Sequence, residues 1–152
     1  MSRTLTILLA TLGSAALLGG AFIFQAFGYP PCAMCIWQRW PHGIAIAIGL
    51  IALMLPGRVL PLLGALAAVT TAAIGVFHTG VERDWWEGPA SCTGTGQSLG
   101  SLSGGDLLSL DGPRLVMCDV VSWELFGLSM ASWNALFSLV LVGLWVAALR
   151  RS

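Results

Sequence analysis

The amino-acid sequence predicts an all-α integral membrane protein: a single domain of residues 1–152, folded as a four-helix bundle with two extracytoplasmic loops. Three observations predict this class. Of the 152 residues, 57% are hydrophobic and only 9% are charged, whereas a soluble domain carries about 25% charged residues. The apolar residues form runs of about the 20 residues that a membrane-spanning helix needs. The seven acidic residues all lie in one stretch, between the last two of these runs.

Four runs are expected to span the bilayer, at about residues 5–28, 36–55, 59–80 and 126–149. The first, third and fourth contain no charged residue. The second is continuously apolar only over residues 43–55, and it becomes long enough only when it is extended back through Trp37 and Arg39. Pro41 interrupts this extension, because proline lacks a backbone donor. The second helix is therefore expected either to kink at Pro41 or to restart with Pro41 in its first turn.

The loops and the charges indicate how the bundle is oriented. Residues 56–58 form a tight turn, and loops of about residues 29–35 and 81–125 lie on the opposite side. Three arginines and all seven acids fall on the loop side. Four arginines fall on the side of the termini: Arg3, Arg58, Arg150 and Arg151. The positive-inside rule then places both termini in the cytoplasm. A cleaved signal peptide is the alternative for the first run, which is longer than the usual apolar segment of about 7–15 residues.

The neutral net charge and the absence of lysine argue against a nucleic-acid partner, which requires clustered positive charge. The partner that composition predicts is instead the lipid bilayer. The net charge of zero is the sum of a net charge of +4 on the predicted cytoplasmic side and a net charge of −4 on the opposite side.

All four cysteines, Cys32, Cys35, Cys92 and Cys118, lie in the two loops. An even set outside the bilayer indicates an oxidising compartment and thiol chemistry. Cys32 and Cys35 form a C-x-x-C motif at the start of the second span, where a helix N-terminus stabilises a thiolate. Arg39 follows Cys35 by one helical turn, and its permanent charge is expected to lower the pKa of that cysteine further. The alternative role for Arg39 is an anchor at the membrane interface.

Three interpretations of the cysteines remain open. Two inert disulfides are common outside the cytoplasm, and a bridge between Cys92 and Cys118 would close a long loop. A zinc site would need two closely spaced pairs, and Cys92 and Cys118 are too far apart for this, so no metal is expected. The favoured interpretation is a redox relay between two cysteine pairs.

Three segments carry a resemblance to a known family. They are P-C-A-M-C-I-W-Q-R at residues 31–39, His78-Thr79, and the block from Cys118 through Trp123 and Gly127 to Trp133. In these segments the chain resembles the DsbB family over nearly its whole length. The resemblance implies a quinone-dependent protein-disulfide oxidoreductase of the bacterial inner membrane, with its cysteine loops in the periplasm. The resemblance also leaves open a paralogue within the family that acts on another thioredoxin-fold partner.

The resemblance also implies a route for electrons. A reduced DsbA-like thioredoxin-fold protein would attack a Cys92–Cys118 disulfide at Cys92. Cys118 would then bridge to Cys32, and Cys35 would be released as the thiolate beside Arg39.

The acceptor that the resemblance implies is a membrane quinone, either ubiquinone or menaquinone, at the outer membrane surface. Cys35 would donate electrons to it, with Arg39 and His78 as its neighbours. The hypothesis that competes with this enzyme is a non-catalytic, disulfide-stapled membrane scaffold or adaptor.

Overall fold

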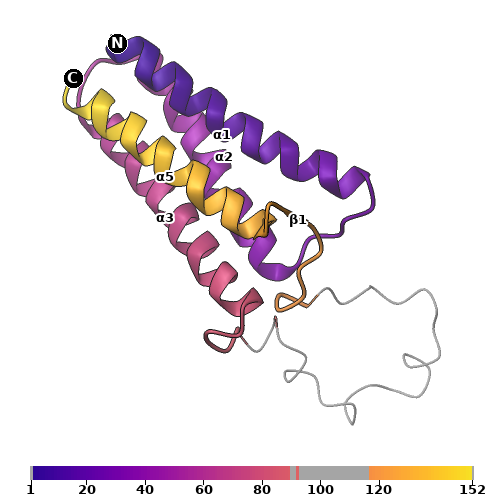
Figure 1. Ribbon diagram of the computed structural model, residues 1–152. Coiled ribbons are helices and arrows are strands. Elements are labelled where there is room, and N and C mark those ends of the chain that lie inside the picture. The colour runs from indigo at the N-terminus through magenta and orange to yellow at the C-terminus, as the bar shows by residue number, and fades with distance from the viewer. Residues whose placement is uncertain (1, 90–91, 93–116, 152) are drawn as a thin grey trace, which may run out of the picture.

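The computed structural model describes residues 2–89, 92 and 117–151. Its elements are α1 (Arg3–Ala26), α2 (Ala33–Met54), α3 (Val59–Glu82), β1 (Glu124–Leu125), β2 (Leu128–Ser129) and α5 (Met130–Leu149). The helices form an elongated bundle with both chain ends at one end (Figure 1). Both α1 and α3 pack against α2 and α5. This arrangement confirms the predicted all-α bundle.

The outer surface of the bundle is apolar. Large hydrophobic side chains on every helix are more than half exposed, among them Leu12, Ile44, Leu66 and Leu139. By length and composition, α1, α3 and α5 can each cross a membrane. Such an apolar exterior suits lipid and would be costly in water. The structure therefore supports the membrane class that the composition predicts.

Helix α2 differs from the other three. It begins at Ala33, earlier than the expected residue 36, and continues through Pro41 without ending or restarting. Within the described chain it is not among the helices apolar enough to span by composition, since polar Gln38, Arg39 and His42 lie in its first half. Gln38 and His42 are buried inside the bundle, so α2 still presents an apolar surface outward. Its passage through the bilayer stays a prediction.

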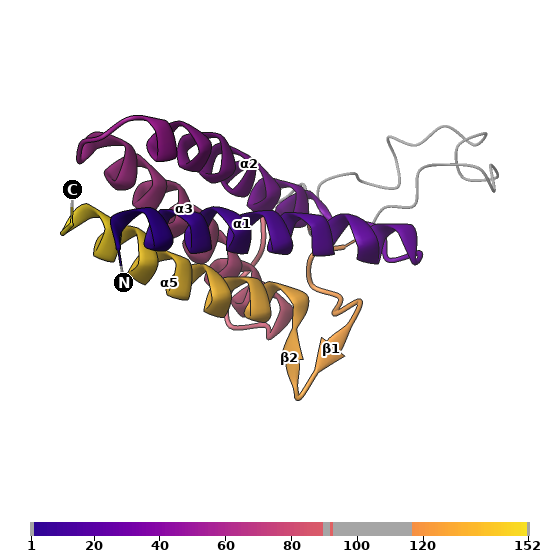
Figure 2. The same cartoon turned by 90° about the horizontal axis from the view of Figure 1, so that it is seen from above.

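The segment before α5 also differs from expectation. Residues 126–129 belong to a β-hairpin and not to the helix, which begins at Met130. Phe126 and Gly127 form its two-residue turn, with φ of 54° and 72°, as in the hairpin turns that match strand twist. The Ser129 side chain then accepts a hydrogen bond from the Ser132 backbone N–H and caps α5. Figure 2 shows the hairpin projecting from the start of α5.

Two buried clusters occupy opposite ends of the bundle. The cluster at the end with the termini contains mostly small residues around one tryptophan: Ile7, Ala10, Ala52, Ala65, Ala68, Leu141, Trp145 and Ala148. Small side chains allow membrane helices to approach closely. The second cluster contains Cys32, Met34, Val81, Cys92 and Cys118. The bundle therefore has one end packed by small residues and one end where the four cysteines gather.

Gly64→Ala is expected to lower the free energy of unfolding by about 1–3 kcal/mol, the usual effect of overpacking. A Cβ at Gly64 would lie 2.6 Å from the ring of Trp145, which is fully buried. Thermal unfolding in detergent measures the change. Gly143→Ala is the control, because a Cβ there meets nothing within 4 Å. Equal midpoints for the two variants would contradict the packing argument.

Candidate functional site

The first turn of α2 holds the C-x-x-C pair. Cys32 is the N-cap of the helix, and its Sγ accepts a hydrogen bond from the Cys35 backbone N–H at 3.2 Å. Both cysteines are free thiols, and their sulfur atoms are 2.9 Å apart. Cys32 and Cys35 precede residues 36–55, which are expected in the bilayer. The first turn of α2 thus places both thiols at a helix N-terminus, which favours thiolate charge.

The other two cysteines form a disulfide. Cys92 and Cys118 are joined with a Cα–Cα distance of 5.0 Å, and both are buried. The Cys118 backbone N–H also donates to the Cys92 carbonyl at 2.9 Å. This bridge brings two distant parts of the second loop together beside α2. The segment between them lies outside the described residues.

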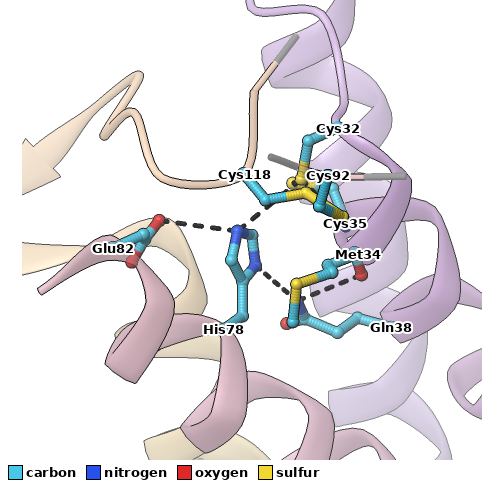
Figure 3. The surroundings of a disulfide bond; sticks show 8 residues. All are labelled: Cys32, Met34, Cys35, Gln38, His78, Glu82, Cys92 and Cys118. Atoms are coloured by element: carbon cyan, nitrogen blue, oxygen red, sulfur yellow. Dashed lines mark hydrogen bonds and ion pairs between the residues drawn. A yellow bond between two sulfur atoms is a disulfide. The ribbon is translucent and has the colours of Figure 1, made fainter. Parts of the chain in front are cut away.

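The two cysteine pairs meet at His78 of α3 (Figure 3). The Nε2 atom of His78 is 3.6 Å from Cys32 Sγ. The ligand atoms of Cys32, His78 and Cys118 all lie within 4.8 Å of one another. These residue types can bind zinc, but a disulfide sulfur is not the thiolate that zinc requires. The arrangement is instead one in which sulfur atoms can exchange partners.

The two thiols of the C-x-x-C pair differ in acidity. The pKa of Cys35 is lowered, chiefly because its sulfur accepts a hydrogen bond from the Cys32 thiol, although burial opposes this effect. The pKa of Cys32 is raised, first by that same hydrogen bond and then by burial. Arg39 also lowers the pKa of Cys35, with a smaller effect than the bond from Cys32. Cys35 is therefore the more acidic thiol of the pair.

Alkylation of the reduced protein by iodoacetamide is expected to modify Cys35 before Cys32. Because the pKa of Cys35 lies below 9.0 and that of Cys32 above it, the Cys35 rate should level off at lower pH. The rate at Cys32 should still rise above pH 9. Mass spectrometry of the modified peptides measures both profiles. Denatured protein is the control, where the two profiles should coincide; coincident profiles in the folded protein would contradict the assignment.

Arg39 lies against α1. Its guanidinium donates to Gln25 Oε1 at 2.6 Å and to the Ala21 carbonyl at 3.3 Å, and it stacks 4.8 Å over the Phe22 ring. Among the described residues, its buried Nε–H has no acceptor. This side chain therefore joins α1 to α2 and retains one hydrogen-bond donor for another group.

A cavity of about 430 Å³ adjoins Cys35, within the range of about 300–1,000 Å³ typical of small-molecule sites. Its walls are mostly apolar and include the aromatic rings of Phe24 and Trp133. Arg39 and Asn134 also line it. A flat apolar molecule with a few polar atoms would suit this lining.

The sequence predicts little or no functional role for four polar residues that the structure places in the site. They are buried or partly buried beside the cysteines and the cavity: Gln38, His42, Glu82 and Asn134. The signal that could have identified Gln38 and His42 is their helical spacing with Met34, because all three share the buried face of α2. Asn134 on α5 forms hydrogen bonds across helices with Gln38 and His42 of α2.

A membrane helical bundle with a dithiol and a disulfide in contact at one end defines a protein of thiol–disulfide chemistry. The comparisons agree with this class. The family model "Disulfide bond formation protein DsbB" matches residues 2–148. The chain belongs to the DsbB family, and is thus a membrane protein of disulfide-bond formation.

One curated relative is 23% identical over 143 residues. It is the "Uncharacterized protein RP370" of Rickettsia prowazekii (strain Madrid E), and the aligned region covers 92% of this chain and 83% of that protein. No solved structure matches the chain.

Proposed function

We propose that the protein reoxidises a reduced, DsbA-like thioredoxin-fold protein in the bacterial periplasm and passes the electrons to a membrane quinone. The observation that carries this proposal is the contact between the two cysteine pairs, with Cys32 and Cys118 sulfur atoms within 4.8 Å. The cavity beside Cys35 and membership of the DsbB family support it. Overall, one dithiol of the partner becomes a disulfide and one quinone becomes a quinol.

The first half of the reaction is thiol–disulfide exchange. A partner thiolate attacks Cys92, the Cys92–Cys118 bond breaks, and Cys118 leaves as a thiolate. The second thiol of the partner then displaces Cys92 and completes the partner's disulfide. When Cys32 and Cys35 are joined in a disulfide, Cys118 attacks Cys32 and releases Cys35 as a thiolate.

The second half returns the protein to its starting state. Cys92 attacks Cys118 of the Cys32–Cys118 bridge, which restores the Cys92–Cys118 disulfide and leaves Cys32 and Cys35 reduced. This combination of one disulfide and one dithiol is the state described above. A quinone supplies a two-electron, two-proton acceptor for that dithiol.

The residues around the cavity fit a quinone. The buried Nε–H of Arg39 has no acceptor among the described residues, and a quinone carbonyl oxygen is an acceptor of the right kind. The rings of Phe24 and Trp133 offer apolar faces to a planar ring. We assign the binding role to Arg39. His78 lines the cavity too, and its polar side-chain contacts include Cys32, Gln38 and Glu82.

The proposed orientation places the cysteine end in the periplasm and both termini in the cytoplasm of an inner-membrane protein. The charge distribution supports it, because four arginines lie at or near the end with the termini: Arg3, Arg58, Arg150 and Arg151. Arg3 binds the Ala52 and Leu55 carbonyls at the end of α2, which holds the N-terminus to that end of the bundle.

A turnover assay tests the function. Quinone-loaded protein is mixed with a reduced DsbA-type dithiol, and thiol loss and quinone absorbance are followed together. One mole of quinone should be reduced per mole of dithiol oxidised. Quinone-free protein is the control and should complete at most the exchange half of the reaction. Oxidation of the dithiol without quinone reduction would contradict the proposed acceptor.

A further inference from the structure

A chain of buried side-chain hydrogen bonds crosses the bundle from His42 to the cysteine pair. His42 Nε2 lies 2.9 Å from Asn134 Oδ1 on α5. Asn134 donates to Gln38 Oε1 at 2.7 Å, and Gln38 Nε2 lies 2.9 Å from His78 Nδ1 on α3. The chain continues from His78 to Cys32. It thus connects three helices to the sulfur atoms, and His42, Asn134 and Gln38 have no place in the relay of electrons.

The direction of each bond follows from one fixed acceptor. Gln38 Nε2 lies 3.2 Å from the Met34 backbone carbonyl, which can only accept, so this end of the Gln38 amide is the NH₂ group. The same NH₂ group therefore donates to His78 Nδ1. A ring nitrogen that accepts carries no proton, and so neutral His78 carries its proton on Nε2.

Asn134 has its orientation determined in the same way. Its NH₂ group donates to Gln38 Oε1 and, at 3.1 Å, to Thr71 Oγ1. Its Oδ1 therefore accepts from the Nε2–H of His42. Thr71 in turn donates to the Gln38 backbone carbonyl at 3.2 Å. Each of these side chains has a hydrogen-bond partner. From His42 onward, each one donates to the next residue in the direction of the cysteines.

At the other end, the proton on His78 Nε2 points into the sulfur cluster. Cys32 Sγ lies 3.6 Å from Nε2. Cys32 then donates to Cys35 Sγ at 2.9 Å. Aligned hydrogen bonds in a buried environment polarise one another. The series of hydrogen bonds therefore strengthens the bond that the Cys32 thiol donates to Cys35.

We infer that Gln38, Asn134 and His42 are positioning residues that hold His78 as the Nε2–H tautomer, so that it donates to Cys32 and stabilises thiolate charge on the Cys32–Cys35 pair. The inference rests on the proposed function, in which that pair must carry such charge at each exchange. In this inference His78 acts as a hydrogen-bond donor to the sulfur atoms of the cysteine pair.

The charged and titratable groups around His78 come from three elements. Helix α3 supplies Glu82, whose Oε1 is 3.8 Å from Nε2, and α2 supplies Cys32, Cys35 and, across the cavity, Arg39. The loop supplies Cys118, which is neutral in its disulfide, and α5 contains no titratable side chain. Glu82 is held by the Ser129 hydroxyl, and it competes with Cys32 as an acceptor for the Nε2 proton. Both acceptors favour the same tautomer.

Nitrogen-15 NMR of the quinone-free protein in detergent, with Cys32 and Cys35 reduced, tests the tautomer directly. The sequence has two histidines, so a His42→Phe variant assigns both. The expected result is a protonated Nε2 and an unprotonated Nδ1 for His78. A proton on His78 Nδ1 would overturn the inference. The tautomer is measured in the parent protein, and the His42→Phe variant serves only to assign the signals.

A second measurement uses Gln38→Met, which keeps the length of the side chain and removes its polar atoms. Its midpoint for Cys35 alkylation should rise by about 0.5–1 pH unit, a moderate loss of hydrogen-bond stabilisation. Thr70→Val is the matched control, since among the described residues the Thr70 hydroxyl bonds only to the Leu66 carbonyl of its own helix. Its midpoint should equal that of the parent. An unchanged midpoint in folded Gln38→Met would overturn the inference.

Neither measurement requires quinone or a thioredoxin-fold partner. Failure of the turnover assay with the expected tautomer would overturn the proposed function and leave the His78 assignment in place. Normal turnover with a proton on Nδ1 would overturn only the inference.

Discussion

Cys35→Ser protein loaded with quinone is expected to lose the coupled oxidation of a DsbA-type dithiol, with quinone reduction falling to the level measured without protein. Serine cannot form a disulfide with Cys32, so that pair has no route for releasing two electrons. The hydroxyl is also far less acidic than a thiol and provides no thiolate beside the cavity. Quinone absorbance and thiol titration measure the loss.

The same variant contains its own control for folding. Its Cys92–Cys118 disulfide is unchanged, so a reduced partner should still undergo one round of exchange with it. Serine differs from cysteine only in the sulfur atom, and it is a good residue in the first turn of a helix. Turnover as fast as that of the parent would rule out Cys35 as the electron donor.

Cys118→Ala is expected to accumulate a mixed disulfide between Cys92 and an oxidised DsbA-type protein. The Cys92 thiolate attacks the partner's disulfide, and one partner sulfur leaves as a thiol. Without Cys118, and with Cys32 and Cys35 joined in their own disulfide, no internal thiol can displace the partner from Cys92. The product is a covalent one-to-one adduct on a non-reducing gel, and a reductant should release both chains.

Cys92→Ala is the matched control and should give little adduct. The Cys118 sulfur lies within 4.8 Å of Cys32 Sγ. When Cys32 and Cys35 are joined in a disulfide, the free Cys118 thiolate should attack Cys32 instead, form a Cys32–Cys118 bridge and release Cys35 as a thiolate. The scaffold hypothesis makes the opposite prediction, because an inert strut forms no adduct in either variant. Equal amounts of adduct in the two variants would contradict Cys92 as the point of attack.

The sequence predicts the helices well, because long uncharged runs have few alternative structures. It could not predict the start of α5, since Phe126 to Ser129 are as apolar as the helix that follows. Only the positive φ of Phe126 and Gly127 reveals the turn. Pro41 was ambiguous for a related reason: one missing donor does not decide whether a buried helix ends, and packing on both sides of Pro41 keeps α2 continuous.

For the site, the sequence identifies residues by type but does not give their partners. The position of Arg39 one helical turn after Cys35 predicts a lowered pKa for Cys35, but the main cause of the lowering is the hydrogen bond from Cys32, with Arg39 secondary. Arg39 binds Gln25 and Ala21, and nothing in the order of residues predicts contacts across helices. Gln38 and His42 were not singled out because single polar residues within an apolar run commonly have only a packing role.

The hairpin before α5 has a mechanical consequence for the relay. Arg83 donates to the Gly127 carbonyl at 3.0 Å, and Ser129 donates to Glu82, so the hairpin is attached to the end of α3 at two points. Cys118 therefore lies on a short strap whose far end is anchored beside His78. Because its sulfur already lies within 4.8 Å of Cys32 Sγ, a change of partner from Cys92 to Cys32 would need only a local displacement of Cys118. The rate of that exchange would then be set by the thiolate chemistry of the site.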